Sequence, residues 1–142
     1  LHAFIQHIKI PVRYGGEYGP DLAAAAALKN LSIDELVAQH TQPIYTVYFM
    51  GFQPGFPYLG GLSPELYSPR HAVPRLQVPA GSVGIGGEQT GIYPFASPGG
   101  WQLLGRTELP LFNLKNEQPT LLQAGDTLSF VAIDVIEGVY EN

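Results

Sequence analysis

The sequence predicts a mostly β, barrel-like domain with two short helices near its start. Three observations lead to this fold class. Several short runs are rich in β-branched and aromatic residues, glycine and proline separate them at short intervals (17 Gly and 13 Pro among 142 residues), and helix-forming sequence is confined to residues 21–40. Many short strands between turn signals are typical of β-barrels and sandwiches. A chain of this length fits one domain, and 45% hydrophobic residues are sufficient for a core.

The first strand is predicted over residues 4–14. Ile8, Ile10 and Val12 alternate there with more polar positions, which gives the strand one apolar face. Pro11 interrupts the other face. Because proline cannot donate a backbone hydrogen bond, it indicates an edge position or a bulge at this point.

Two helices are predicted after a glycine-rich break. The first is Ala-rich and covers residues 22–29, with Asp21 as its N-cap and Asn30 at its end. The second begins with a Ser-Ile-Asp-Glu capping box at Ser32 and runs to about His40. We expect both helices to pack as a layer over the sheet, and the alternative is a partner-binding face.

The remaining strands are short, and a tight turn at residues 123–126 precedes the last of them. In that last strand Leu128, Phe130 and Ala132 alternate with Ser129, Val131 and Ile133, which predicts burial on both faces or nearly so. The strands are predicted over residues 44–50, 76–79, 83–86, 91–93, 101–107 and 127–133, with 110–112 as a further candidate.

Residues 51–61 show neither a helical nor a strand period and are predicted to form a long, turn-rich loop, which continues irregularly through residues 63–74. Taken singly, the aromatic residues Phe52, Phe56 and Tyr58 are best explained as barrel core. As a group they lie in a loop broken by prolines and glycines, where a core strand is not expected. Because loops of fixed geometry are commonly functional, the group favours a binding surface.

Composition and charge exclude several classes of function. The net charge is −5, and the seven Lys and Arg residues are scattered, so nucleic acid is not an expected partner. No cysteine is present, which excludes disulfides, thiolate nucleophiles and cysteine-based zinc sites. No apolar run approaches the length of a membrane span and no signal peptide is visible, so we expect a cytoplasmic protein.

Charged residues make up only 13% of the chain, which is about half of the usual share. This composition favours a protein that hides part of its surface against another protein, or a domain cut from a larger chain. Because the sequence starts with Leu1 and not with Met, we expect further residues upstream.

The sequence patterns do not favour three kinds of self-contained site, although a Ser-His-Asp triad is assembled in space and needs no fixed sequence pattern. The glycine-rich residues 81–87 lack the Gly-Lys-Ser/Thr ending of a phosphate loop and the spacing of a dinucleotide fingerprint. The four histidines show no metal-ligand spacing, so no metal is expected. Ser82 and Ser97 lie in glycine-flanked turns without the Gly-x-Ser-x-Gly pattern of a nucleophile elbow, so a stand-alone hydrolase is not expected.

What remains is a set of arginines, amide side chains and aromatic residues on predicted loops. Such a set is the usual make-up of a small-molecule or peptide cleft with an apolar floor and a few directed polar groups. Its members are Gln53, Arg70, Arg75, Glu88, Gln89 and Arg106 together with Phe52, Phe56, Tyr58, Tyr93 and Trp101.

Four motifs in this region carry a family resemblance. They are Gly51-Phe-Gln-Pro-Gly-Phe-Pro-Tyr-Leu-Gly60, Val78-Pro-Ala-Gly-Ser-Val-Gly-Ile-Gly-Gly87, Gln89-Thr-Gly-Ile-Tyr-Pro94 and Ser97-Pro-Gly-Gly-Trp-Gln-Leu-Leu-Gly-Arg-Thr107. Together they closely resemble the allophanate hydrolase subunit 1 family, and the match extends over nearly the whole chain. That family includes the B subunit of bacterial ATP-dependent 5-oxoprolinase and a bacterial inhibitor of a sporulation histidine kinase.

The resemblance implies a single cyclophilin-like β-barrel domain of carboxyltransferase type over residues 1–142. Family members carry a small α/β domain before this one, which the present sequence lacks. The resemblance also implies a partner, subunit 2 of the same family, that completes a composite site; in 5-oxoprolinase this partner is the C subunit. With ATP as cofactor the pair opens 5-oxo-L-proline to L-glutamate, together with a third, lactam-utilisation protein. Two alternatives stay open: a regulator that inhibits a histidine kinase, and the carboxyltransferase component of a urea carboxylase or allophanate pathway.

The resemblance supplies no catalytic residues, so the site is predicted as a set of positions that face the substrate or the partner. Within it, Arg75 and Arg106 are candidates for binding an acid and phosphoryl charge, because their planar forks suit both. Gln53 and Gln89 are candidates for hydrogen bonds to the lactam. The full set is Phe52, Gln53, Phe56, Tyr58, Arg75, Ser82, Gln89, Thr90, Tyr93 and Arg106. The cyclophilin isomerase pattern is not found, so isomerase activity is not expected.

Overall fold

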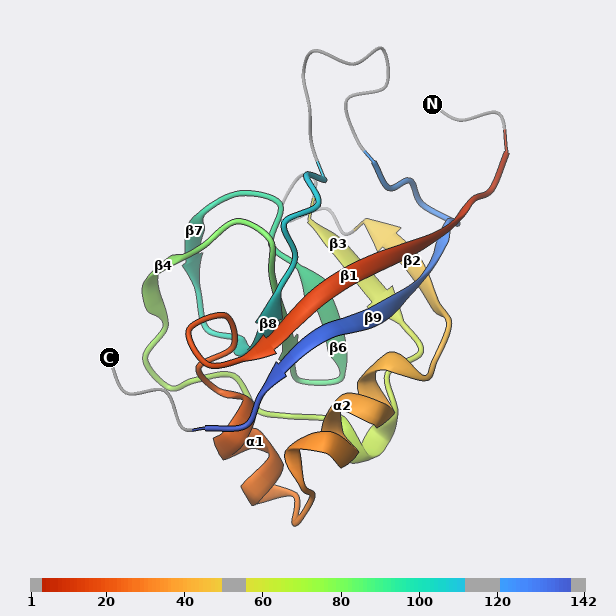
Figure 1. Cartoon of the computed structure of the whole chain (residues 1–142). Coiled ribbons are helices and arrows are strands. Elements are labelled where there is room, and N and C mark those ends of the chain that lie inside the picture. The colour runs from red at the N-terminus through yellow and green to blue at the C-terminus, as the bar shows by residue number, and fades with distance from the viewer. Residues whose placement is uncertain (1–3, 50–55, 112–120, 139–142) are drawn as a thin grey trace.

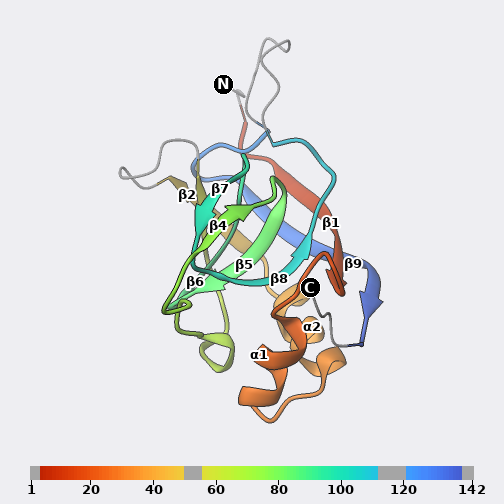
Figure 2. The same cartoon turned by 90° about the vertical axis from the view of Figure 1, so that its left-hand side faces the viewer.

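A computed structural model of the chain describes residues 4–49, 56–111 and 121–138. Seven strands close into a barrel in the order β1-β8-β5-β6-β3-β2-β9, and β4 and β7 form a separate two-stranded ribbon beside it (Figures 1 and 2). The predicted mostly β barrel with two short helices is confirmed. The barrel strands are β1 (His7–Gly15), β2 (Tyr45–Phe49), β3 (Pro57–Gly60), β5 (Ser82–Gly86), β6 (Gln89–Ile92), β8 (Gln102–Arg106) and β9 (Thr127–Ile136); the ribbon is β4 (Arg75–Val78) with β7 (Ser97–Gly99); the helices are α1 (Leu22–Leu28), α2 (Ile33–Thr41) and a 3-10 turn, η1 (Pro64–Leu66).

The barrel closes where its first and last strands lie side by side (Figure 1). β1 and β9 pair in parallel from His7 and Thr127 onward, with a register shift after Val12. On its other side β1 pairs with β8 only at Arg13 and Tyr14. Pro11 therefore faces no strand on that side and lies next to an irregularity, in agreement with the predicted edge or bulge position.

The outer half of β9 corrects a prediction. Leu128 and Phe130 are buried, but Val131 and Ile133 are 41% and 54% exposed. The expectation that this strand is buried on both faces is therefore wrong. β-branched residues favour strands whether or not they are covered, so the pattern predicts the strand correctly and its burial incorrectly.

The two helices begin and end at local signals in the sequence. Asn30 has a φ of 55°, the left-handed geometry of a residue that follows a helix, and the amides of Asn30 and Leu31 bond back to the last turn of α1 as in a Schellman motif. At α2, Ser32 and Glu35 form the predicted capping box, with bonds of 3.0 and 2.9 Å. Asp21 precedes α1, but its side chain makes no capping hydrogen bond.

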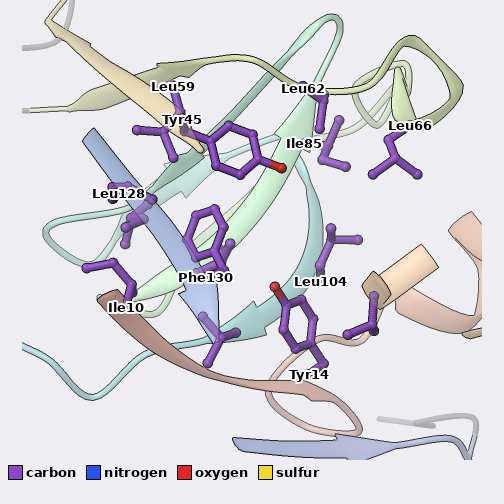
Figure 3. Packing of buried hydrophobic residues seen from close by; sticks show 14 of the residues in the cluster. Ile10, Tyr14, Tyr45, Leu59, Leu62, Leu66, Ile85, Leu104, Leu128 and Phe130 are labelled. Atoms are coloured by element: carbon purple, nitrogen blue, oxygen red, sulfur yellow. The ribbon is translucent and has the colours of Figure 1, made fainter. Parts of the chain in front are cut away.

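The main core fills the barrel and the space between the barrel and the helices. Figure 3 shows Tyr14, Tyr45 and Phe130 meeting inside the barrel among aliphatic side chains. α1 packs against β8 and β1, and α2 packs against β9, and Leu36 of α2 is fully buried. Both helices pack against the barrel as expected, but they lie at one end of it (Figures 1 and 2) and do not form a layer over one face of a sheet.

Three further predictions of secondary structure need correction. Residues 57–60 form β3, which pairs with β2 and β6, so the expectation of loop over the whole of 51–61 is wrong for these four; residues 50–55 lie outside the described part. Pro57 is tolerated because it is the first residue of the strand. Pro110 and Leu111 are not in a strand, and Phe112 is outside the described residues. The β7 strand escapes prediction, because it is three residues long and contains Pro98.

Candidate functional site

A second hydrophobic cluster lies outside the barrel core and contains most of the predicted site aromatics. Phe56 is its centre, with ring centroids 4.8 Å from Tyr58, 5.1 Å from Tyr93 and 5.3 Å from Trp101. Val78 of the ribbon and Leu103 of β8 complete the cluster. Most of these ring pairs are edge-to-face or tilted, which is the favourable geometry for aromatic contacts.

Glycines on the neighbouring strands leave the space that these rings occupy. A Cβ atom at Gly91 would lie 2.9 Å from Phe56 and 2.8 Å from the carbonyl oxygen of Pro57. One at Gly99 would lie 2.7 Å from the ring of Tyr93, and one at Gly86 would overlap the indole of Trp101. The glycine-rich sequence therefore permits close packing around the aromatic rings, which agrees with the rejection of a phosphate loop.

The aromatic rings form the walls of a pocket of about 390 Å³. This volume is near the lower end of the range for small-molecule sites, which begins at roughly 300 Å³. Burial raises the pKa values of Tyr58 and Tyr93 against the opposing charge of Arg70, so both hydroxyl groups are neutral near pH 7. The lining consists of Phe56, Tyr58, Tyr93, Trp101, Arg70 and the stretch Pro98, Gly99 and Gly100; below it is called the aromatic pocket.

Arg75 does not line this pocket and is bound within the protein. Its two terminal nitrogens donate to both carboxylate oxygens of Asp21, at 2.9 and 3.0 Å. Asp21 also accepts the backbone amide of Leu103 at 2.7 Å, and Nε2 of His71 lies 3.1 Å from Oδ2. Burial alone would raise the pKa of Asp21, but the hydrogen bonds from Arg75 and Leu103 and the nearby ring of His71 lower it.

This ion pair changes the expected roles of both residues. The sequence predicts Asp21 as a helix N-cap, but its carboxylate instead ties the β4 strand to β8. The bidentate fork of Arg75 is occupied by that carboxylate and holds the β4–β7 ribbon against the barrel. Sequence reasoning misses the pair because 54 residues separate its members.

Arg106 and Ser82 lie at a different place, where β8 and β5 pair. Arg106 lines a second pocket of about 400 Å³. Its guanidinium donates to the carbonyl of Glu17 at 3.3 Å and lies 5.3 Å from the ring centre of Tyr18. Within the described part of the chain, Nε of Arg106 and Oγ of Ser82 are buried without a hydrogen-bond partner. Tyr93 lines both pockets.

Thr90 points into the barrel interior and is fully buried. Its hydroxyl donates to the carbonyl of Gly84 at 2.8 Å and must therefore accept from Nε2 of His40, which is 2.9 Å away. Nδ1 of His40 is then the acceptor for the Tyr14 hydroxyl at 2.6 Å. Burial lowers the pKa of His40 to about 3, so the ring is neutral, as this arrangement requires.

Of the predicted set, the structure brings Phe56, Tyr58 and Tyr93 together at the aromatic pocket. Arg106 lines the second pocket, which shares Tyr93 with the first, and the carbonyl of Ser82 accepts the backbone amide of Tyr93. Gln89 begins β6 opposite Gly86 and lines neither pocket. Phe52 and Gln53 lie outside the described residues. Trp101 and Arg70 stand out in the sequence as residues of the right type, but neither is in the predicted set of site residues. Arg75 and Arg106 are the arginines predicted for the site, because no local pattern shows which arginine is engaged by another residue.

The described residues also bear on metals and membranes. Among them, no group of three or more His, Asp or Glu could hold a metal ion. No helix within the described ranges is both long and apolar enough to cross a membrane.

Comparison with characterised proteins gives several relatives of high identity. The chain is 58% identical over 134 residues to the B subunit of 5-oxoprolinase from Haemophilus influenzae, covering 94% of this chain and 61% of that protein. It is 54% identical over 126 residues to the protein of the same name from Bacillus subtilis, and this match covers 89% of this chain and 52% of that protein. The chain therefore spans between about half and two thirds of the length of these relatives.

Solved structures give the same fold. A conserved uncharacterized protein from Pyrococcus horikoshii superposes with a TM-score of 0.86 at 50% identity, over 91% of this chain and 60% of the other. The urea amidolyase of Kluyveromyces lactis superposes with a TM-score of 0.73 at 21% identity, over 92% of this chain and 10% of the other. This similarity concerns the fold alone. The family model described as carboxyltransferase domain, subdomain C and D, matches residues 3–122. The chain belongs to this carboxyltransferase-domain family.

Proposed function

We propose that this chain is a carboxyltransferase-type domain of the B subunit of a cytoplasmic, ATP-dependent 5-oxoprolinase, and that it forms a composite site with a partner protein. The observation that carries the proposal is the identity of 54–59% to three proteins that bear the name of the 5-oxoprolinase B subunit. The aromatic pocket supports it, because its volume and its mixture of ring faces and one cation suit a small, cyclic acid.

The chemistry explains why such an enzyme needs ATP. The lactam carbonyl of 5-oxoproline is an unreactive amide. Transfer of the γ-phosphoryl group to its oxygen releases ADP and turns that oxygen into part of a leaving group. A first water then adds to the activated carbon, and the ring carbon–nitrogen bond breaks to give glutamyl phosphate. A second water releases inorganic phosphate and leaves glutamate.

The distribution of charge supports a division of labour between two proteins. Phosphoryl transfer is catalysed mainly by positioning and by cations that neutralise the phosphate oxygens. Arg70 is the one cationic side chain that lines the aromatic pocket in the described part of the chain, and Arg75 is bound to Asp21. We therefore propose that the partner, the C subunit, supplies most of the ATP site, and that a lactam-utilisation protein completes the ring opening.

The two alternative functions have weaker support. A histidine-kinase regulator and a biotin-dependent carboxyltransferase component both remain compatible with the fold. However, the relatives above 50% identity carry the 5-oxoprolinase name, and the similarity to urea amidolyase at 21% identity concerns only the fold.

A reconstitution experiment tests the proposal. The full-length protein that contains this domain is purified together with its C-subunit partner and the lactam-utilisation protein, and release of ADP that depends on 5-oxo-L-proline is measured. We expect activity only when all components are present. Full activity in the absence of this protein, or no activity from the complete mixture, would contradict the proposal. Addition of biotin carboxylase and urea in parallel tests the carboxyltransferase alternative.

A further inference from the structure

The aromatic pocket has one cationic side chain at its rim, and this gives it a defined ligand class. We propose that the pocket binds a carboxylate-bearing lactam ring, with Arg70 as the anchor for the carboxylate and the rings of Phe56, Tyr93 and Trp101 as the surface for the lactam ring. The identity of the ligand as 5-oxo-L-proline rests on the proposed function. The class of ligand rests on the pocket.

Arg70 differs from the other arginines in being available to a ligand. It is exposed, and no hydrogen bond or ion pair joins it to another described residue. The guanidinium of Arg75 is bound to Asp21, that of Arg106 to the carbonyl of Glu17. Arg70 alone of these three lines the aromatic pocket. A free guanidinium presents a planar fork that matches a carboxylate.

The backbone on both sides of Arg70 is fixed, although the side chain is free. The carbonyl of Pro69 accepts a 2.9 Å bond from the side chain of Gln102, and the amide of His71 donates a 2.7 Å bond to the carbonyl of Gly100. The ring of His71 also lies 3.1 Å from the Asp21 carboxylate. Because its neighbours are tied to the pocket wall, the position of Arg70 is set before a ligand arrives, which lowers the entropy cost of binding.

The remaining walls suit a small ring better than a nucleotide. Phe56, Tyr93 and Trp101 line the pocket, whose volume is about 390 Å³, and their burial holds these rings in place. A triphosphate brings several negative charges, whereas the pocket presents one cation. Aromatic faces also stack on adenine, so nucleotide binding is the outcome that competes with the proposal and is included in the test.

The test is calorimetric titration of the complex between the full-length protein and its C-subunit partner, with each lactam in the absence of ATP and, in a separate run, with ATP alone. We expect 5-oxo-L-proline to bind, and 2-pyrrolidinone, the same lactam without the carboxylate, to bind at least about ten-fold more weakly. Arg70→Gln should weaken 5-oxo-L-proline binding by roughly ten- to hundred-fold and leave 2-pyrrolidinone unchanged. Arg13→Gln is the matched control, because it changes an arginine on β1 that does not line the pocket. It should leave the affinities for both lactams unchanged.

Several results would overturn the inference. They are equal affinity for the two lactams, no effect of Arg70→Gln, or ATP binding that Arg70→Gln abolishes while 5-oxo-L-proline binding persists. The comparison of the two lactams needs only the native protein, so it stands even where a variant does not fold.

Steady-state kinetics separate failure of this inference from failure of the proposed function. In an active complex, Arg70→Gln should raise the KM for 5-oxo-L-proline by at least about ten-fold, with a smaller change in kcat. An active complex whose KM is unaffected by this change would refute the assignment of the pocket, while the proposed enzymatic function would stand. An inactive complex that still binds 5-oxo-L-proline through Arg70 would refute the proposed enzymatic function, while the assignment of the pocket would stand.

Discussion

His40 shows how one residue can be essential to the core without belonging to a functional site. Its imidazole stacks on Phe130 at 4.6 Å and joins Tyr14 to Thr90 through both ring nitrogens. In the sequence it is a histidine with no metal-ligand partner, and nothing local distinguishes a buried imidazole from an exposed one. Every polar atom of the ring is satisfied in one neutral tautomer, which is the condition for burying such a group at low cost.

The buried state of His40 predicts a loss of stability in mild acid. The pKa of His40 is lowered to about 3 in the folded protein by burial, whereas in the unfolded chain it is about 6.5. The unfolded state therefore binds a proton first as the pH falls, and the free energy of unfolding decreases by about 1.4 kcal/mol per pH unit below about pH 6.5. Urea unfolding at pH 7, 5.5 and 4.5 measures this slope. His40→Gln should flatten it, and an unchanged slope in this variant would contradict the assignment.

Thr90 provides a second test of the same network, and of its separation from the aromatic pocket. Thr90→Val removes the hydroxyl and leaves Nε2–H of His40 and the carbonyl of Gly84 without their present partner. We expect a loss of about 1–3 kcal/mol in the free energy of unfolding. Thr90→Ser keeps the hydroxyl and should retain most of the free energy of unfolding that Thr90→Val loses. At temperatures where both variants are folded, the KM for 5-oxo-L-proline should be unchanged. A large rise in KM would mean that Thr90 contacts substrate after all.

At the scale of elements, the β4–β7 ribbon determines the shape of the aromatic pocket. The ribbon pairs at Arg75 with Gly99 and at Val78 with Ser97, and Asp21 fixes it to the barrel through Arg75. Gly99 faces the ring of Tyr93 so closely that no side chain fits between them. The close approach of the ribbon to the Tyr93 ring therefore depends on a glycine at position 99.

Gly99→Ala should disturb the pocket by moving either Tyr93 or the ribbon. The new methyl group would lie 2.7–2.8 Å from two ring carbons of Tyr93, and Tyr93 is too well buried to move freely. We expect a loss of about 1–3 kcal/mol in stability and a several-fold weaker binding of 5-oxo-L-proline. Gly138→Ala is the matched control, because a Cβ atom there meets nothing within 4 Å. If Gly99→Ala and Gly138→Ala had the same stability and the same affinity for 5-oxo-L-proline, the ribbon would accommodate the methyl group without loss of free energy.

Elements with local sequence signals are predicted correctly, whereas elements that depend on distant contacts are not. The capping box at Ser32 and the alternation in β1 are local patterns, and both are predicted correctly. β3 escapes prediction because a proline begins it and a glycine ends it within four residues, while its stability comes from pairing with β2 and β6. The burial of β9 is predicted wrongly because apolar composition alone does not say whether another layer covers a strand.

For the candidate site, the motifs cover most of the residues that line the aromatic pocket, but they do not show how these residues are arranged. The aromatic cluster around Phe56 falls inside these motifs as predicted. The sequence prediction favours Arg75 and Arg106. Only the fold shows that Asp21 engages Arg75, that Arg106 lies over Tyr18, and that Arg70 lines the pocket. Ion pairs between residues far apart in sequence leave no local pattern, so their effect on a site emerges only in three dimensions.

At the scale of the whole molecule, the barrel depends on contact between the two ends of the described chain. β1 and β9 pair over their full length, and the partners His7 and Thr127 are 120 residues apart. Such pairing carries a large loop-closure cost that must be met before the contacts form. Folding of this domain should therefore be slow, in the range of milliseconds to seconds that is typical of non-local β topologies.

Removal of β9 tests this dependence directly. Deletion of residues 127–142 takes Leu128 and Phe130 out of the core and leaves β1 without its parallel partner, so we expect loss of the cooperative urea transition and of the near-ultraviolet circular dichroism signal. Ile133→Thr in the intact chain is the control for the strand itself, because Ile133 is 54% exposed and its change should cost less than about 0.5 kcal/mol. A truncated protein that still unfolds cooperatively would mean that the other six barrel strands fold without closure. Stopped-flow refolding of the intact chain, followed by the emission of Trp101, completes the test, since a relaxation faster than about a millisecond is incompatible with closure through β1 and β9.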